Sequence, residues 1–138
     1  MSACAAGPTV ARMTKPAVPK PMPRIALIDD DAAVREAVGF ALNAEGYEVE
    51  GFANAQAVLA LGDPDSFACL VVDLRLPDDD GLSLIRALRQ RGCTVPAILM
   101  TTQPDARCRR EAARISTPIV EKPLIGDVLS DCIRAVSG

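Results

Sequence analysis

The stretch RIALIDDD, residues 24–31, decides the fold, together with its shorter counterpart LVVD at residues 70–73. Each is an apolar run that ends in aspartate. Short apolar runs bounded by turn residues are typical of strands buried on both faces of a parallel sheet. Further apolar runs, and one segment in which apolar and polar residues alternate, also have the pattern of strands. We therefore expect strands at residues 25–28, 47–52, 68–72, 97–100 and 118–120.

Segments with apolar residues at helical spacing follow these strands, at residues 33–45, 54–61, 82–91, 104–114 and 125–136. Gly46 and Gly92 stand where helices commonly end, and Asn54 is a favourable N-cap. The segment at 104–114 is only weakly amphipathic, so we expect a short or irregular helix there. Strands joined by helical crossovers predict an α/β fold: a doubly wound, five-stranded parallel sheet, (βα)5, with helices on both faces.

The first 23 residues differ from the rest in composition. Five prolines punctuate small residues and three basic ones, without apolar periodicity. This pattern predicts a disordered, partly polyproline-II tail over residues 1–23, followed by one domain over residues 24–138. A second possibility is that translation begins at Met22, directly before the first strand, and the sequence leaves both open.

Composition excludes several classes of function. The chain has a net charge of −3, 3% aromatic residues and no histidine. Nucleic acids and anionic membranes require a basic surface, and bases require aromatic stacking, so neither partner is expected. Without histidine, Ser-His-Asp and Cys-His catalysis, histidine-ligated metals and a phosphohistidine donor are all excluded.

The five cysteines form no C-x-x-C pair and their number is odd. A disulfide framework is therefore not expected, and the cysteines are better explained as reduced, buried small residues. No apolar stretch reaches the ~18 residues of a membrane helix. The N-terminus lacks the apolar core of a secretory signal. We expect a cytoplasmic protein.

Polar side chains stand at the end of four predicted strands. They are Asp29 to Asp31, Asp73, Thr101 with Thr102, and Glu121 with Lys122. Each alone has an ordinary explanation as a helix cap, a turn residue or a solvated strand end. In doubly wound sheets, however, ligands bind at the carboxyl ends of the strands. The conjunction therefore predicts one site that combines carboxylates, a hydroxyl and an ammonium.

This set of groups has a definite chemistry. Carboxylates packed together repel one another unless a cation neutralises them. Hard oxygen ligands suit Mg²⁺. With Mg²⁺ bound, Asp73 can act as a nucleophile on a phosphoryl group, while an ammonium and a hydroxyl stabilise the charge on the transferring oxygens.

Four motifs in order resemble the receiver domains of two-component response regulators, the CheY-like family. They are residues 24–31, Asp73 with Pro77 and Asp80-Gly81, residues 96–101, and Lys122-Pro123. The resemblance covers about residues 24–138 and implies a flavodoxin-like fold of the CheY type. It implies that Asp73 is the phosphoacceptor and that Thr101 is the switch hydroxyl. Lys122 would contact the phosphoryl group, with a cis bond to Pro123.

The resemblance also implies the metal ligands and the partners. Asp29, Asp30, Asp73 and the backbone carbonyl of Arg75 would hold Mg²⁺. The phosphoryl group would come from a histidine kinase or a histidine phosphotransfer protein. The domain would catalyse at most its own phosphorylation and slow dephosphorylation. Because the last predicted helix reaches almost to Gly138, we expect signalling by contact with an unknown protein target, or a role as phosphoryl intermediate or sink.

The chain departs from the family pattern at four places. Thr102 replaces the usual Ala or Gly after the switch hydroxyl, Ile119 replaces the aromatic switch residue, and Leu124 replaces a common Phe. The segment from Thr101 to Lys122 is also slightly shorter. An aliphatic residue cannot rotate as the aromatic does, so we expect a smaller response at the usual output face.

Three other functions fit the sequence less well. A receiver fold kept as a phosphorylation-independent scaffold would be favoured by loss of the acceptor, acids or lysine, and all are present. A phosphatase of the haloacid-dehalogenase type needs a second aspartate two residues after the nucleophile, where this chain has Arg75. A flavodoxin-like FMN binder needs a hydroxyl-rich loop after the first strand, where this chain has acids.

Overall fold

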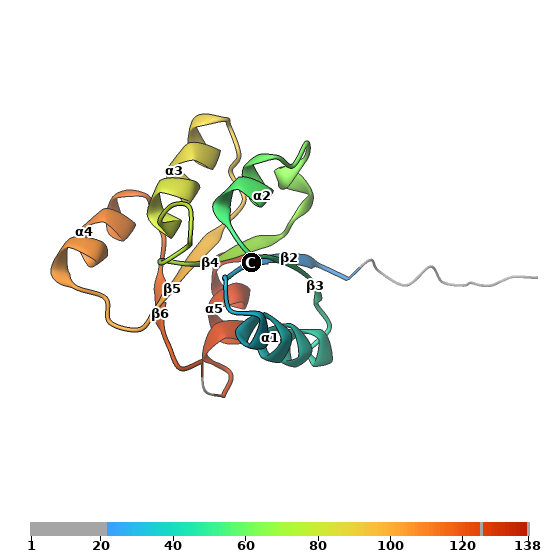
Figure 1. The fold of residues 1–138 in the computed structure, drawn as a ribbon. Coiled ribbons are helices and arrows are strands. Elements are labelled where there is room, and N and C mark those ends of the chain that lie inside the picture. Colours follow the sequence, from blue (N-terminus) through green and yellow to red (C-terminus); the bar gives the residue numbers. More distant parts are fainter. Residues whose placement is uncertain (1–21, 125, 138) are drawn as a thin grey trace, which may run out of the picture.

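The computed structural model describes residues 22–124 and 126–137 (Figure 1). The predicted tail lies outside the described residues except for Met22 and Pro23. The strands are β2 (Arg24–Ile28), β3 (Glu48–Phe52), β4 (Cys69–Asp73), β5 (Ala97–Thr101) and β6 (Ile119–Glu121). The helices are α1 (Ala32–Ala44), α2 (Ala55–Leu59), α3 (Gly81–Gln90), α4 (Ala106–Arg114) and α5 (Val128–Ser137), with a 3₁₀ turn at Pro64–Ser66.

The strands form one sheet in the order β3-β2-β4-β5-β6, and every neighbouring pair is parallel. The predicted (βα)5 topology is confirmed. Helices α1 and α5 cover one face of the sheet and α2, α3 and α4 cover the other (Figure 1).

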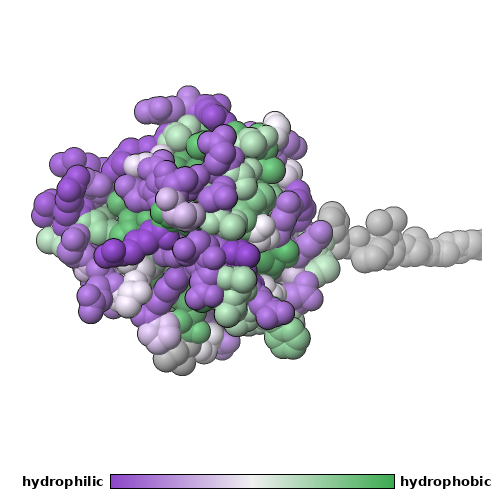
Figure 2. Space-filling model, viewed as in Figure 1, coloured by the Kyte–Doolittle hydropathy of each residue, from purple (hydrophilic) through white to green (hydrophobic). Residues whose placement is uncertain are grey.

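Alternation along each strand divides the core into two layers. On β2, Ala26 and Ile28 pack toward α2 and α3, whereas Ile25 and Leu27 pack toward α1 and α5. All four are fully buried. Burial on both faces explains why these strands appear in the sequence as continuous apolar runs. On the face drawn in Figure 2, hydrophilic and smaller apolar areas are interspersed.

Short polar side chains cap the N-termini of four helices, including the predicted cap Asn54. Asp31, Asn54, Asp80 and Asp105 each accept a hydrogen bond from a backbone N–H in the first turn of the following helix. Such caps satisfy donors that a helix N-terminus leaves free. The predicted helix ends at Gly46 and Gly92 are confirmed by their positive φ angles of 98° and 89°.

The helix expected at residues 104–114 is present and short, as expected, but the expectation that it is only weakly amphipathic is wrong. Helix α4 is regular, and its buried face consists of Cys108 and Ala112. These two residues are one turn apart but small, so they contribute little to an apolar pattern in the sequence. In the described part of the chain no helix is both long and apolar enough to span a membrane.

At Gly81, α3 approaches the sheet very closely. A Cβ there would lie 2.4 Å from the backbone oxygen of Asp73 and 2.9 Å from Cγ1 of Val72. Only glycine allows α3 to start this close to the end of β4. A Cβ at Gly62, by contrast, meets no atom within 4 Å.

Gly81→Ala should therefore destabilise the fold, although alanine normally stabilises a helix relative to glycine. We expect a loss of about 2 kcal/mol or more in the free energy of unfolding, the usual scale for forcing an atom into a packed site. Urea denaturation measures it, with Gly62→Ala as the matched control. Equal urea midpoints for the two variants would contradict the close approach.

Candidate functional site

The strand ends bring the predicted site residues to one edge of the sheet. Asp29 directly follows β2, Asp73 ends β4 and Thr101 ends β5. Lys122 follows β6, and its backbone N–H donates to the carbonyl of Thr101 at 2.9 Å. Since β2, β4, β5 and β6 are successive neighbours in a parallel sheet, their carboxyl ends meet here.

Three carboxylates cluster at this edge. Asp29, Asp30 and Asp73 each offer a carboxylate oxygen, and the three oxygens lie within 4.8 Å of one another. Asp29 is fully buried and Asp73 is 7% exposed, while Asp30 is exposed to solvent. Three anionic oxygens at this spacing are a donor set that fits a hard divalent cation such as Mg²⁺.

The ammonium of Lys122 lies between two of these carboxylates. Its Nζ is 2.8 Å from Oδ2 of Asp29 and 3.3 Å from Oδ2 of Asp73. Burial acts to lower the pKa of Lys122, but the bond to Asp29 and the charges of both aspartates outweigh it. The pKa of Lys122 is therefore raised above its usual value, and the side chain stays protonated.

The surroundings of Asp73 disfavour its charged form. Burial and the nearby charge of Asp29 raise its pKa above the ordinary aspartate value, and the attraction of Lys122 offsets this only in part. Without a further cation, the charged form of Asp73 is thus disfavoured in the folded state. The site has a deficit of positive charge where Asp73 stands.

The loop after β4 turns the peptide of Arg75 toward Asp73. The N–H of Arg75 donates to Oδ1 of Asp73 at 3.4 Å. Arg75 and Asp80 form an isolated antiparallel β-bridge. Two hydrogen bonds flank this bridge: the N–H of Gly81 donates to the carbonyl of Leu74, and the N–H of Leu76 donates to the carbonyl of Asp79. In such a pair the opposed residues direct their own N–H and C=O away from each other. The carbonyl of Arg75 therefore faces the same side as its N–H, toward the carboxylates.

Arg35 was not predicted from the sequence, yet it fixes the turn between β2 and α1. Its Nη1 donates to the backbone oxygen of Asp29 at 2.6 Å, and the N–H of Asp31 donates to Oδ1 of Asp29 at 2.9 Å. Gly51 on β3 leaves room, since a Cβ there would lie 3.1 Å from Cδ of Arg35. The sequence carries no signal for this contact, because the acceptor is a backbone oxygen.

The positions that correspond to the family's switch residues differ in burial. Thr101 is 4% exposed, whereas Thr102 is exposed to solvent. Ile119 pairs with Leu99 on β5 and packs half-buried against the core layer under α2, α3 and α4. An aliphatic side chain thus occupies a packed position next to α4.

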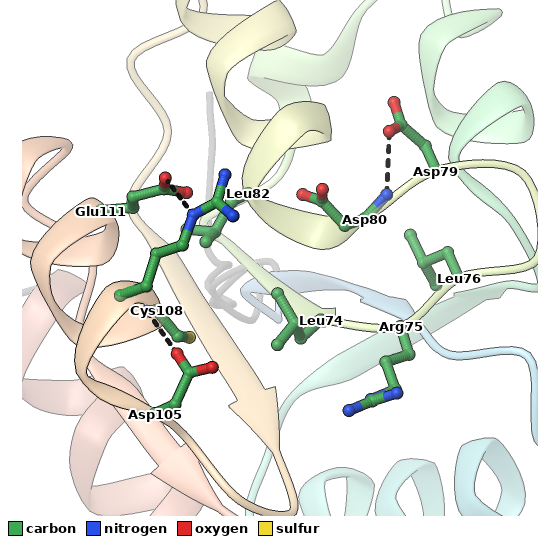
Figure 3. Close-up of a pocket in the computed structure, with 10 residues that line it drawn as sticks. Leu74, Arg75, Leu76, Asp79, Asp80, Leu82, Asp105, Cys108 and Glu111 are labelled. Carbon is green, nitrogen blue, oxygen red and sulfur yellow. Dashed lines mark hydrogen bonds and ion pairs between the residues drawn. The ribbon is translucent and has the colours of Figure 1, made fainter.

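A separate open groove of about 530 Å³ lies between the loop after β4, the start of α3 and the start of α4 (Figure 3). Leu74, Leu76 and Leu82 supply its apolar lining, and Asp80 and Asp105 stand beside it as helix caps. Asp29, Asp30 and Asp73 do not line it. The groove therefore lies beside the carboxylate cluster, and Arg75 borders both.

Comparison with known proteins agrees with this geometry. Residues 25–134 match the family described as the response regulator receiver domain. The chain belongs to that family. Receiver domains are the phosphorylation-switch modules of two-component response regulators, they bind Mg²⁺ at an acidic pocket, and they are generally not true enzymes.

Curated relatives include the transcriptional regulatory protein FixJ of Azorhizobium caulinodans, which is 34% identical over 122 residues. That match covers 88% of this chain and 57% of the relative, so this receiver chain spans about half the length of the curated relatives it matches.

Solved structures give the same fold. The structure described as FixJ-N aligns with a TM-score of 0.74 at 30% identity, over 83% of this chain and 93% of that one. The chemotaxis protein CheY4 of Vibrio cholerae aligns with a TM-score of 0.77 at 24% identity, over 84% of this chain and 99% of that one.

Asp73→Asn should stabilise the receiver domain in the absence of metal. Because the folded pKa of Asp73 lies above its unfolded value, ionisation of Asp73 costs folding free energy at pH 7. That cost disappears below the unfolded pKa, where Asp73 is protonated in both states. In EDTA at pH 7 the urea midpoint of Asp73→Asn should exceed that of the parent, and the gap should shrink as the pH falls toward 3.8. A gap that is constant with pH, or of opposite sign, would contradict the assigned charge balance.

Proposed function

We propose that this receiver domain accepts a phosphoryl group on Asp73 and that Mg²⁺ binds beside it. The observation that carries the proposal is the meeting of three carboxylates and one ammonium at the ends of β2, β4 and β6. Among the three acids, Asp73 is the one contacted both by Lys122 and by the peptide of Arg75. It is therefore the carboxylate best held for attack.

The residues present suit Mg²⁺. Asp29, Asp30 and Asp73 would hold the ion, and the carbonyl of Arg75, which faces the same side as its N–H, would add a neutral oxygen ligand. When bound, the ion would neutralise the carboxylates and stabilise negative charge on a transferring phosphoryl group. A cation bound here would also favour the charged form of Asp73, whose pKa is raised by burial and by the charge of Asp29.

The chain's own groups would perform the remaining steps. A carboxylate oxygen of Asp73 forms the new P–O bond as the P–N bond to a histidine of the donor breaks, and the electron pair of that bond stays on the imidazole. Lys122 moves from its pairing with Asp73 to a phosphoryl oxygen, and its raised pKa keeps it charged. The hydroxyl of the buried Thr101 donates a hydrogen bond to a second phosphoryl oxygen.

The donor would be a histidine kinase or a histidine phosphotransfer protein. A small apolar groove of about 220 Å³ runs beside the site, between α1 and the segment after β6. Val34 and Val38 line one side, Pro123 and Leu124 the other, and Lys122 connects the groove to the acceptor. An apolar helix face that carries the phosphohistidine would fit this position.

The conformational change that follows phosphorylation would then be transmitted through the ends of β5 and β6. Drawing Thr101 and Lys122 toward the phosphoryl group shifts both strand ends, which carry the connections to α4 and α5. Because Ile119 is aliphatic and packed, the response near α4 should be smaller than in relatives with an aromatic residue. The receiver would signal in the cytoplasm, by contact with a protein target or by passing the phosphoryl group on.

Incubation with acetyl phosphate tests the proposal. The parent should show a transient gain in mass of one phosphoryl group that requires Mg²⁺. Asp73→Asn keeps the shape of the side chain but removes the nucleophile, so the gain should disappear. Asp79→Asn is the matched control and should behave like the parent, because within the described residues the side chain of Asp79 accepts only from the N–H of the adjacent Asp80.

A phosphoryl gain that persists in Asp73→Asn would overturn the assignment of the acceptor. No gain in the parent, with correct folding, would favour the alternative of a phosphorylation-independent scaffold. Hydrogen exchange with and without beryllofluoride extends the test to the switch. Slower exchange around Thr101 and Lys122 is expected in the parent, and unchanged exchange would remove the switch while leaving the phosphorylation.

A further inference from the structure

Three consecutive aspartates follow Pro77, and in the described part of the chain only one of their side chains hydrogen-bonds to a distant element. The carboxylate of Asp78 accepts from the N–H of Ala55 at 3.0 Å and from the N–H of Gln56 at 2.9 Å. Both donors belong to the first turn of α2. Asp78 lies in an exposed turn, yet its hydrogen bonds span 22 and 23 residues.

The neighbours of Asp78 bond locally. Asp79 accepts from the N–H of Asp80, and Asp80 caps its own helix by accepting from the N–H of Ser83. Helix α2 also has its own cap, because Asn54 accepts from the N–H of Ala57. Asp78 therefore uses the two helix donors that Asn54 leaves free, and it joins two elements that are distant in sequence.

We propose that Asp78 is a positioning residue for the metal site: it anchors the loop after β4 to α2, and so holds the carbonyl of Arg75 toward the carboxylates. This inference rests on the proposed function, since it concerns a ligand of the Mg²⁺ proposed there.

The connection from Asp78 to Arg75 is short and stiff. Pro77 lies between them with a fixed φ. Two backbone hydrogen bonds close the loop. The N–H of Leu76 donates to the carbonyl of Asp79 at 3.1 Å, and the N–H of Gly81 donates to the carbonyl of Leu74 at 2.7 Å. Asp78 stands at the tip of this closed turn, so fixing the tip fixes the direction of the Arg75 peptide.

The other end of the anchor is rigid as well. Ala55 and Val58 of α2 are each 1% exposed and belong to the core layer that also contains Val72 and Leu82. The carboxylate form is favoured too, because the bonds from Ala55 and Gln56 lower the pKa of Asp78 below its usual value. A charged acceptor bound to two N–H groups is a stronger tie than a neutral one.

The test separates positioning from stability by the Mg²⁺ dependence of phosphorylation. Initial rates with acetyl phosphate are measured against Mg²⁺ concentration for the full chain and for Asp78→Asn, whose amide has only one acceptor oxygen. Because the variant loosens a partner of a metal ligand, the half-saturating Mg²⁺ concentration should rise about tenfold or more. The rate at saturating Mg²⁺ should change little, since Asp73 and Lys122 are untouched.

Two controls are matched to this variant. Asp79→Asn removes the same charge one residue away and should leave the half-saturating concentration unchanged. Asn54→Ala removes the other cap of α2, so it should lower the melting temperature without moving the Mg²⁺ dependence.

Three results would overturn the inference. One is an unchanged half-saturating concentration in a folded Asp78→Asn, and another is an equal rise in Asp79→Asn. The third is an equal rise in Asn54→Ala, which would reduce Asp78 to a stabilising cap. A parent whose phosphorylation needs no Mg²⁺ would overturn the proposed metal function together with this inference, whereas the first three results would leave that function standing.

Discussion

The structure depends on one electrostatic constraint: two buried carboxylates, Asp29 and Asp73, share the ammonium of Lys122. Buried charges persist only when they are paired, and one ammonium does not balance two carboxylates. The raised pKa of Asp73 expresses that imbalance. The site is therefore built to attract a cation, and a bound cation would favour the charged form of the nucleophile. In this account the unphosphorylated receiver holds Lys122 in place until a phosphoryl group competes for it.

Several contacts outside the site keep these charges in place. Gly81 lets α3 begin against the backbone of Asp73. Arg35 fixes the turn that carries Asp29, with room left by Gly51. Asp78 ties the loop that carries Arg75 to α2. None of these residues belongs to the cluster of carboxylates. Each limits how far a charged group can move, and restricted movement makes the interactions of a small, crowded site effective.

Sequence reasoning could predict what depends on local patterns. Apolar runs ending in polar residues located the strands, and parallel topology then brought Asp29, Asp73, Thr101 and Lys122 to one edge. It failed where the decisive fact was a contact between distant segments or a small side chain. Asp78 looks like any turn aspartate until α2 is placed beside it. The buried face of α4 consists of Cys108 and Ala112, which are too small to mark an amphipathic helix. Arg35 gave no signal because its partner is a backbone oxygen.

The position of the acceptor is the central claim, and chemical trapping tests it most directly. Borohydride reduces an acyl phosphate to an alcohol, so a phosphorylated aspartate becomes homoserine, which tandem mass spectrometry can locate. After treatment with acetyl phosphate, Mg²⁺ and borohydride, the account predicts homoserine in place of Asp73 and none after the same treatment in EDTA. Homoserine in place of Asp29 or Asp30 instead, or equal conversion in EDTA, would contradict the account.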